Sequence, residues 1–292
     1  MGIFGLFSSK KYGYSEDELE QIVYNADQGN KTAAAMVGEM FRRGMSSEEH
    51  NAVRRKAYGP RAEMGDPDAQ YWMGLLSSKS PADSFKWYSL AAEQGHVASM
   101  KSLALGYCSA TNEEGSTMLG FGYDPKKEVY WLTKAAEAGD ADAMCTLALN
   151  YTIGEGVEKD LEECRKWYAR AADLGYPKAY LGMAELHKMS PYYDREKAIC
   201  YLKKAAEKSD VDTVVSAAQS LGMMYGGCYV FGGEPYSGAD PHEALYWLCQ
   251  AYIVGDNPYY KEYIQKLCNA TGLAIPDEQW KQWVVEARSR VI

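Results

Sequence analysis

Apolar residues along most of this chain recur at the three- and four-residue spacing of a helix face, and glycines separate the helical stretches. Residues 141–175 show the pattern most completely. Four residues of the first stretch share one face: Ala143, Leu147, Ala148 and Tyr151. Gly154 and Gly156 indicate the end of that helix, because glycine tolerates the left-handed conformation of a helix stop. Asp160 is a candidate N-cap for a second helix. The buried face of that helix would carry Cys164, Trp167, Tyr168, Ala171 and Ala172. The pattern predicts a helix–turn–helix whose apolar faces are covered by neighbouring copies.

The second helix contains the motif Trp-Tyr-x-x-Ala-Ala-x-x-Gly, which recurs along the chain. Clear copies end at Gly95, Gly139 and Gly175, and weaker ones end at Gly255 and at Ser209, where serine replaces glycine. Degenerate copies precede Gly29 and Gly65. These closing positions are 30 to 46 residues apart. A period in this range indicates a stacked array of supersecondary units rather than one closed core.

The residues of the central copy resemble the Sel-one-like repeat, a relative of the tetratricopeptide repeat. The resemblance is carried by Ala143, Leu147, Ala148, Tyr151, Gly154, Gly156, Val157, Asp160, Trp167, Tyr168, Ala171, Ala172 and Gly175. It is good at 66–95 and 97–139, thins at 30–65 and 176–209, and is interrupted at 210–255. We therefore expect an all-α fold, a right-handed α-solenoid of about six helix pairs. Its expected parts are an N-terminal extension (1–14), the solenoid (15–256) and a C-terminal helical cap (257–292).

Several segments depart from the repeat. Only the central copy keeps the Gly-x-Gly-Val linker. We expect longer Gly-rich loops at 109–124 and 226–240, and a shortened one at 77–83. After Gly255, Pro258 and Pro276 introduce two further amphipathic helices, which suit the terminal unit that a solenoid needs.

The composition limits the class of partner and the compartment. The net charge is -9 and the pI is near 5.1, which argues against a nucleic-acid binder that relies on phosphate neutralisation. No apolar run approaches the ~18 residues of a membrane span. The apolar N-terminus lacks the pattern of a secretory signal. The seven cysteines include no Cys-x-x-Cys, and the cysteine pairs that staple secreted members of the resembled family are absent. We expect a cytoplasmic protein.

Residue types that carry chemistry are scattered. The four histidines lie in different repeats without metal-ligand spacing, and no Gly-x-Ser-x-Gly elbow occurs. Gly120-Phe121-Gly122 lacks the third glycine of a dinucleotide site. His187 has the position of a partly buried structural residue. We predict no catalytic, cofactor-binding or metal-binding residues, and no enzymatic activity. The resemblance implies one rival, a β-lactam-type hydrolase, but the serine–lysine and elbow motifs are missing.

Partner-binding residues are predicted on two kinds of surface. In helical-hairpin arrays, the first helix of each repeat lines the concave face. Alignment on the closing positions places these residues there: Glu39, Arg42, Asp68, Tyr71, Leu75, Lys101, Asp142, Cys145, Lys178, Glu185 and Lys188. The set is mixed in sign, so the net acidity does not concentrate in the predicted groove. Tyr229, Phe231 and Tyr236 lie in the 226–240 insertion, where no helix stripe requires them, and exposed aromatic residues are typical of interfaces.

An extended surface of this kind suits a protein or peptide better than a metabolite. The resemblance implies two roles for a bacterial protein: an adaptor or scaffold, and an immunity protein that neutralises a toxin effector. Insertions that break the repeat favour a dedicated inhibitor, because one partner-specific interface uses such variation. We expect binding of one cognate toxin effector, with an adaptor or scaffold as the alternative.

Overall fold

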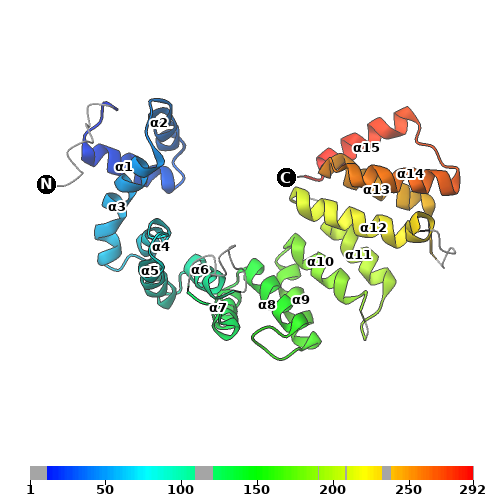
Figure 1. Cartoon of the computed structure of the whole chain (residues 1–292), viewed down its shortest axis with the longest axis horizontal. Helices are drawn as coiled ribbons and strands as arrows, with labels where there is room; N and C mark the ends of the chain where they lie inside the picture. The colour runs from blue at the N-terminus through cyan, green and yellow to red at the C-terminus, as the bar shows by residue number, and fades with distance from the viewer. Residues whose placement is uncertain (1–11, 109–120, 190, 208, 232–237, 292) are drawn as a thin grey trace. The chain divides into compact units, whose positions relative to one another are not determined.

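A computed structural model describes residues 12–108, 121–189, 191–207, 209–231 and 238–291 (Figure 1). Within this part of the chain, fifteen helices and no strand are found. The all-α repeat fold expected from the sequence is confirmed. The helices form two compact units, Met1–Ala138 and Gly139–Ile292. Each unit is described by itself below.

The first unit contains seven helices. They are α1 (Glu16–Asp27), α2 (Lys31–Arg42), α3 (Ser47–Glu63), α4 (Pro67–Leu76), α5 (Pro81–Glu93), α6 (Val97–Tyr107) and α7 (Pro125–Glu137). Helix α1 packs against both α2 and α3, and α4–α5 and α6–α7 form hairpins. The loop expected at 77–83 is shorter than predicted, because Pro81 already occupies the first position of α5. Of the loop expected at 109–124, residues 109–120 lie outside the described part.

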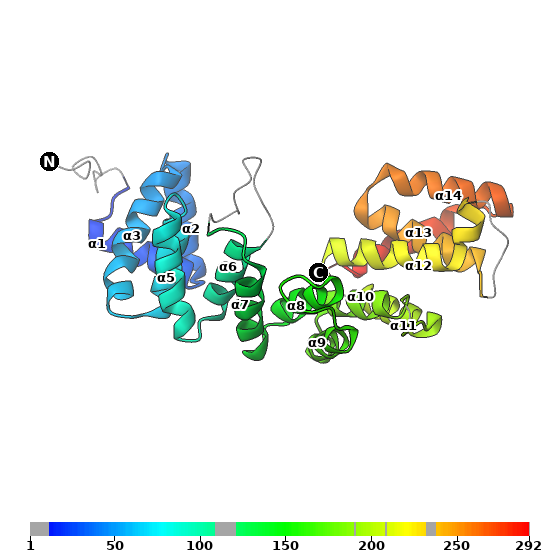
Figure 2. The same cartoon turned by 60° about the horizontal axis from the view of Figure 1, so that its bottom comes forward.

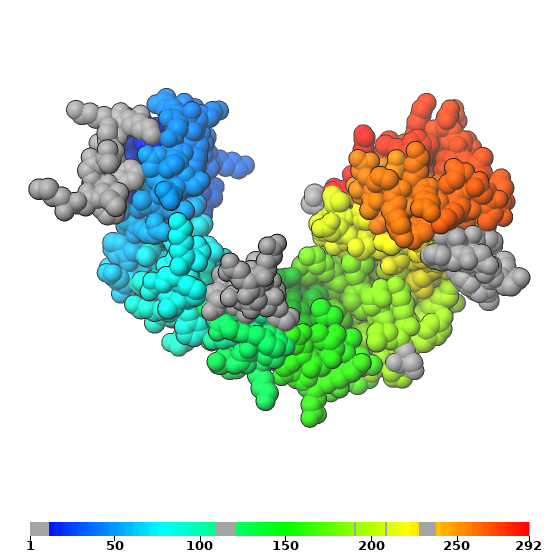
Figure 3. Space-filling view, in the orientation of Figure 1, coloured from blue at the N-terminus to red at the C-terminus, as the bar shows by residue number. Residues whose placement is uncertain are grey.

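The second unit contains eight helices. They are α8 (Ala141–Ile153), α9 (Leu161–Asp173), α10 (Pro177–Leu186), α11 (Arg195–Ala205), α12 (Val211–Phe231), α13 (Pro241–Gly255), α14 (Pro258–Thr271) and α15 (Asp277–Ser289). Three hairpins, α8–α9, α10–α11 and α12–α13, follow one another, and α14 and α15 pack against α13. In Figure 3, α14 and α15 (orange to red) form the surface at the end of this unit.

The helix boundaries follow the polar residues and glycines of the repeat. Asp160 caps α9 as predicted, since its carboxylate accepts hydrogen bonds from the backbone N–H groups of Glu162 and Glu163 at 2.9 and 3.1 Å. Five predicted closing glycines have a positive φ, between 76° and 96°: Gly29, Gly65, Gly95, Gly139 and Gly175. The prediction is wrong at Gly255. That glycine remains helical, and Asp256 takes the left-handed conformation instead, with φ 45°.

Paired alanines let the second helix of each repeat approach its neighbours closely, as the motif predicts. Ala135 and Ala136 are fully buried, and so are Ala205 and Ala206. The motif tyrosines pack against glycines of adjacent helices. A Cβ added at Gly74 would lie 2.4 Å from the Tyr88 ring, and one at Gly182 would lie 2.2 Å from the Tyr168 ring. Tyrosine therefore fills the space that a missing side chain leaves.

The loop predicted at 226–240 is wrong in its first half, because α12 continues to Phe231. Its glycines serve helix packing. A Cβ at Gly222 would lie 2.7 Å from Leu248, and one at Gly226 would lie 2.4 Å from Ala244. Helices α12 and α13 thus approach too closely for any larger residue at these two positions, and they share the main core of the second unit with α14 (Figure 1).

Candidate protein-binding surfaces

In the first unit, the predicted inward-facing charges on α2 are paired within their own helix. The Glu39 carboxylate accepts from Arg43 at 2.9 Å and lies 2.8 Å from the Arg42 guanidinium. These hydrogen bonds and charges lower the pKa of Glu39. Arg42 is 76% exposed and remains available to a partner.

Tyr71, a predicted partner contact, also packs against aromatic residues within the first unit. Its ring lies 5.0 Å from the His96 ring and 5.9 Å from the Tyr88 ring, so it joins α4 to α5 and to the start of α6. His96 caps α6, and its Nε2 lies 3.2 Å from the Asp68 carboxylate. Much of the Tyr71 side chain is therefore used in packing, and Lys101 on α6 is half-buried as well.

In the second unit, the predicted residues Asp142 and Cys145 lie on α8, and Lys178 and Glu185 lie on α10, which packs against α8. Lys188 follows two residues after the end of α10. Lys178 is exposed, whereas Asp142 accepts a hydrogen bond from the Tyr176 hydroxyl at 3.0 Å. Glu185 and Lys188 form an ion pair at 2.6 Å. The side chains of Tyr229 and Phe231, and the whole of Tyr236, lie outside what the structure describes.

Three exposed leucines share one position of the repeat, and the sequence prediction named only Leu75 among them. Leu75, Leu105 and Leu149 each stand ten residues after a closing glycine, and their exposed fractions are 39, 44 and 49%. Glu39 and Glu185 hold the same position in other repeats. The alignment on closing glycines already contained this signal. These leucines lie in the second halves of their helices and are not fully buried in the core, so they offer apolar contact area to a partner.

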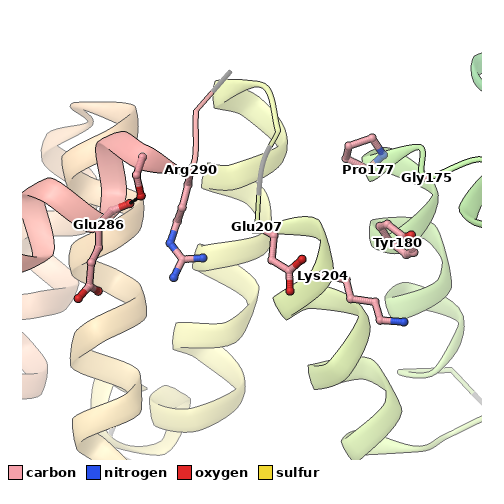
Figure 4. A pocket seen from close by; sticks show the side chains of 8 residues that line it. Gly175, Pro177, Tyr180, Lys204, Glu207, Glu286 and Arg290 are labelled. Atoms are coloured by element: carbon pink, nitrogen blue, oxygen red, sulfur yellow. Dashed lines mark hydrogen bonds between the residues drawn. The ribbon is translucent and has the colours of Figure 1, made fainter.

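A groove of about 600 Å³ lies in the second unit, between α10, α11 and α15 (Figure 4). Its lining residues are Gly175, Pro177, Tyr180, Lys204, Glu207, Glu286, Ser289 and Arg290. Two are basic, two are acidic, and Tyr180 supplies the aromatic surface. None of these residues was predicted as a partner contact, although Lys178 is adjacent to Pro177 in the sequence.

The wall that α15 contributes is fixed by Arg290. Its backbone carbonyl accepts from the Ser209 N–H at 2.9 Å, beside a parallel bridge between Ser209 and Val291. Its guanidinium donates to the Ala206 carbonyl at 3.1 Å and to the Tyr246 hydroxyl at 2.9 Å. Ser209 is itself buried, and its hydroxyl donates to the Ala205 carbonyl. Residue 209, where serine stands in place of the closing glycine, therefore binds the segment of Arg290 and Val291 that follows α15.

The charged side chains of the groove differ in the hydrogen bonds and ion pairs that they form within the protein. Glu286 accepts hydrogen bonds from Tyr246 and Gln282, both at 2.9 Å. Lys204 lies 5.8 Å from the centres of the Tyr180 and Tyr201 rings and makes no ion pair with any described residue. The Glu207 carboxylate has neither a hydrogen bond nor an ion pair among the described residues. Lys204 and Glu207 are therefore open to the charges of a partner.

Three side chains of the second unit that could act as nucleophiles are hydrogen-bonded or buried. The Ser289 hydroxyl donates to the carbonyl of Glu286 at 2.7 Å, so it is engaged in its own helix. Burial raises the pKa of the Cys145 and Cys249 thiols to about 12, which keeps them protonated and weakly nucleophilic. His187 is half-buried, as predicted, and its ring stacks on Tyr201 at 5.7 Å.

Neither a metal-binding cluster nor a membrane-spanning helix occurs among the described residues. No three His, Cys, Asp or Glu side chains among them lie close enough to hold a metal ion. The helices of the described part are all too short or too polar to cross a membrane.

The fold defines an all-α helical-repeat protein, and the surfaces described above are candidates for protein binding. A sequence model of the Sel1 repeat matches residues 64–96, 115–140, 141–176, 177–210 and 216–256, which together make up more than half of the chain. The chain belongs to the Sel1 repeat family, whose members are in general protein–protein interaction modules. No curated protein matches the sequence.

Two solved structures share the fold. One is c5321, a protective antigen of uropathogenic Escherichia coli strains that displays an SLR fold, with a TM-score of 0.63 and 21% identity. The match covers 94% of this chain and 56% of that protein, so this chain spans little more than half of its length. The other is a Sel1 repeat protein from Oxalobacter formigenes, with a TM-score of 0.54 and 24% identity, covering 81% of this chain and 87% of that one.

Proposed function

We propose that this chain is a non-enzymatic, cytoplasmic bacterial protein that binds one dedicated protein partner, a toxin effector that it neutralises. The observation that carries the proposal is the groove of the second unit. One of its walls, formed by Glu286, Ser289 and Arg290, lies beyond residue 256, where the matched repeats end. A surface built partly outside the shared repeat suits a partner private to this chain.

The charged residues that line the groove indicate which side chains a partner segment would carry. Lys204 and Glu207 stand one helical turn apart without pairing with each other, so they can bind a carboxylate and a basic side chain of one partner segment. Tyr180 offers the rigid aromatic surface that is common in interface hot spots. Mixed charges favour specificity, because a partner with the opposite arrangement would place like charges together.

The groove alone is small for a stable complex, which typically buries about 800 Å² on each partner. Leu149 and Ile153 on α8 are 49 and 57% exposed and would add apolar contact area in the same unit. The six free cysteines among the described residues support the cytoplasmic location, because disulfides are rare in a reducing compartment.

Co-expression tests the proposal. Affinity capture from the bacterial host provides the partner, which is then expressed with the wild type or with the double variant Lys204→Glu and Glu207→Lys. This variant leaves the net charge unchanged. The partner should stop growth when it is expressed alone. Co-expression of the wild type should restore growth, whereas co-expression of the double variant should not. A partner that is harmless alone would contradict the inhibitor role.

An adaptor or scaffold is the second candidate. It is favoured by the presence of separate exposed surfaces in the two compact units, with Leu75 and Leu105 in the first and the groove in the second. The stoichiometry of purified complexes distinguishes the two functions. An inhibitor forms one tight complex at a ratio of one to one, whereas a scaffold binds different proteins on the two units at once.

A further inference from the structure

A second pocket lies in the first unit, where the start of α5 meets the end of α6 and the segment before α7. It measures about 510 Å³ and is lined by Pro81, Ala82, Phe85, Tyr107 and Phe121. The three helices follow one another in the first unit (Figure 2). The lining is almost entirely apolar, in contrast to the charged groove of the second unit.

Three aromatic rings form the floor of this aromatic pocket, and each contacts the other two. The ring centres are 5.3 Å apart for Phe85 and Phe121, 5.9 Å for Tyr107 and Phe121, and 6.3 Å for Phe85 and Tyr107. All three pairs meet edge to face, the geometry that aromatic quadrupoles favour. The pocket is therefore preformed and needs no rearrangement of its rings.

Phe121 is held in place from two sides. A Cβ at Gly106 would lie 2.0 Å from its ring, so the ring rests directly on the bare surface of α6. The backbone N–H of Asp124 donates to the Tyr107 carbonyl at 3.1 Å, which fixes the segment after Phe121 to the end of α6. Glycine at position 106 is thus required for the pocket.

The pocket is a surface feature rather than part of the core. Phe85 is 38% exposed, and Pro81 and Ala82 beside it are exposed as well. Tyr107 is buried, with 6% of its surface exposed. An apolar concavity that solvent reaches, with rigid aromatic edges, is the usual form of a site that takes an apolar side chain from a partner.

Among the exposed and half-exposed residues that the structure describes near the pocket, basic side chains outnumber acidic ones, although the whole chain is acidic. The Lys127 ammonium lies 5.1 Å from the centre of the Tyr107 ring. Lys126, at the start of α7, and Lys86, four residues after Ala82 on α5, are also exposed. On the acidic side, Asp83 is exposed, and Asp124 caps α7 and lies 3.3 Å from Lys127. Glu128, next to Lys127, is buried, so three lysines stand against two aspartates among these described residues, which favours an acidic partner.

We propose that the aromatic pocket binds an extended, proline-containing segment of a partner protein in which acidic residues flank the proline. Aromatic-lined clefts recognise such segments because the proline backbone is already extended before binding. The lining comes from helix ends, so the cleft is short and does not run along a helix as a groove for a partner helix would. This binding is separate from the groove of the second unit and does not depend on the toxin-neutralising role.

Fluorescence anisotropy with labelled synthetic peptides tests the proposal. The probe is an extended peptide with two Pro-x-x-Pro repeats flanked by glutamates. The comparison peptides carry lysine flanks, or serine in place of proline. We expect the wild type to bind the first peptide, with about tenfold or greater loss for either comparison peptide. No binding of the glutamate-flanked peptide, or equal binding of all three, would overturn the proposal.

Three variants locate the binding. Ala82→Glu places a like charge in the pocket without removing any packed ring, and Lys127→Glu reverses the charge beside Tyr107. Both should weaken binding about tenfold or more. Lys134→Glu, seven residues further along α7, is the matched control and should bind as the wild type does. Equal binding by Ala82→Glu would refute the assignment. Lys204→Glu should leave peptide binding unchanged, so failure here is distinguishable from failure of the proposed function.

Discussion

The hairpins α8–α11 and the C-terminal helices α12–α15 belong to the same unit but use the repeat differently. At the end of α9, Gly175 turns the chain with φ 76°, and a Cβ at this position would meet nothing within 4 Å, so the glycine serves the turn as a generic repeat requires. At the end of α11, Ser209 replaces the glycine, and its backbone binds the end of the chain through Arg290. The regular hairpins make the scaffold, and the irregular part builds a groove upon it. A position that departs from the repeat motif can thus mark a new intramolecular contact.

Replacing a core leucine of the C-terminal helices should lower stability far more than replacing an exposed leucine of α8. Leu248→Ala on α13 removes a fully buried side chain and should lower the free energy of unfolding by about 2–5 kcal/mol. Leu149→Ala on α8 removes a side chain that is 49% exposed and should change it by less than about 0.5 kcal/mol. Urea denaturation followed by circular dichroism measures both. Equal losses would show that Leu149 belongs to the core and is not a binding surface.

Neighbouring glycines on α12 test whether the C-terminal helices are packed through glycine. Gly226→Ala would place its Cβ 2.4 Å from Ala244 and should destabilise the protein by about 1–3 kcal/mol. Gly227→Ala meets nothing within 4 Å and should stabilise the helix by about 0.5–1 kcal/mol. Thermal unfolding of the two variants should therefore shift in opposite directions. A shift in the same direction would contradict the close packing of α12 on α13.

Arg290 tests how the end of the chain is bound. Arg290→Ala removes two hydrogen bonds from a charged donor and should destabilise the protein by about 1–3 kcal/mol. Arg288→Ala, on the exposed side of α15, is the control and should have little effect. Hydrogen exchange gives a local readout, because the Ser209 amide bonded to Arg290 should lose protection only in Arg290→Ala. Unchanged protection would mean that Arg290 does not hold this contact.

A small change in the pH dependence of stability is expected from His50 in the first unit. His50 is buried, and burial together with the charge of Arg54 lowers its pKa below the ordinary histidine value, whereas Asp27 acts in the opposite direction. The unfolded chain therefore binds a proton more readily than the folded one. The contribution of His50 to stability is complete above the ordinary pKa and is lost as the pH falls through it. Urea unfolding between pH 8 and 5 should show a shallower pH dependence in His50→Phe, and an identical dependence would exclude this role.

The sequence predicted the local parts of this fold better than the contacts between them. Asp160 as an N-cap and Gly175 as a helix stop follow from rules that act within a few residues, and the structure has both. The continuation of α12 was missed because Gly226 and Gly227 suggest a loop when nothing in the sequence shows the helix that packs on Gly226. Local signals cannot distinguish a glycine needed for a turn from one needed for close approach.

The groove of the second unit was beyond prediction for the same reason. Ser209 and Arg290 are 81 residues apart in the sequence, and no periodic pattern links them. The exposed leucines are different, because their common position ten residues after a closing glycine was readable from the alignment. The inward-facing charges on α2, α8 and α10 remain predictions for binding, although ion pairs and hydrogen bonds already occupy Glu39, Asp142 and Glu185.

Titration calorimetry of the purified partner against this chain tests the central claim, that the groove of the second unit binds a single protein. The wild type should show one binding site per chain. Lys204→Glu and Glu207→Lys should each weaken binding about tenfold or more. Lys166→Glu on α9, outside the groove, should bind as the wild type does. Wild-type affinity in both groove variants would show that the partner does not bind in the groove of the second unit.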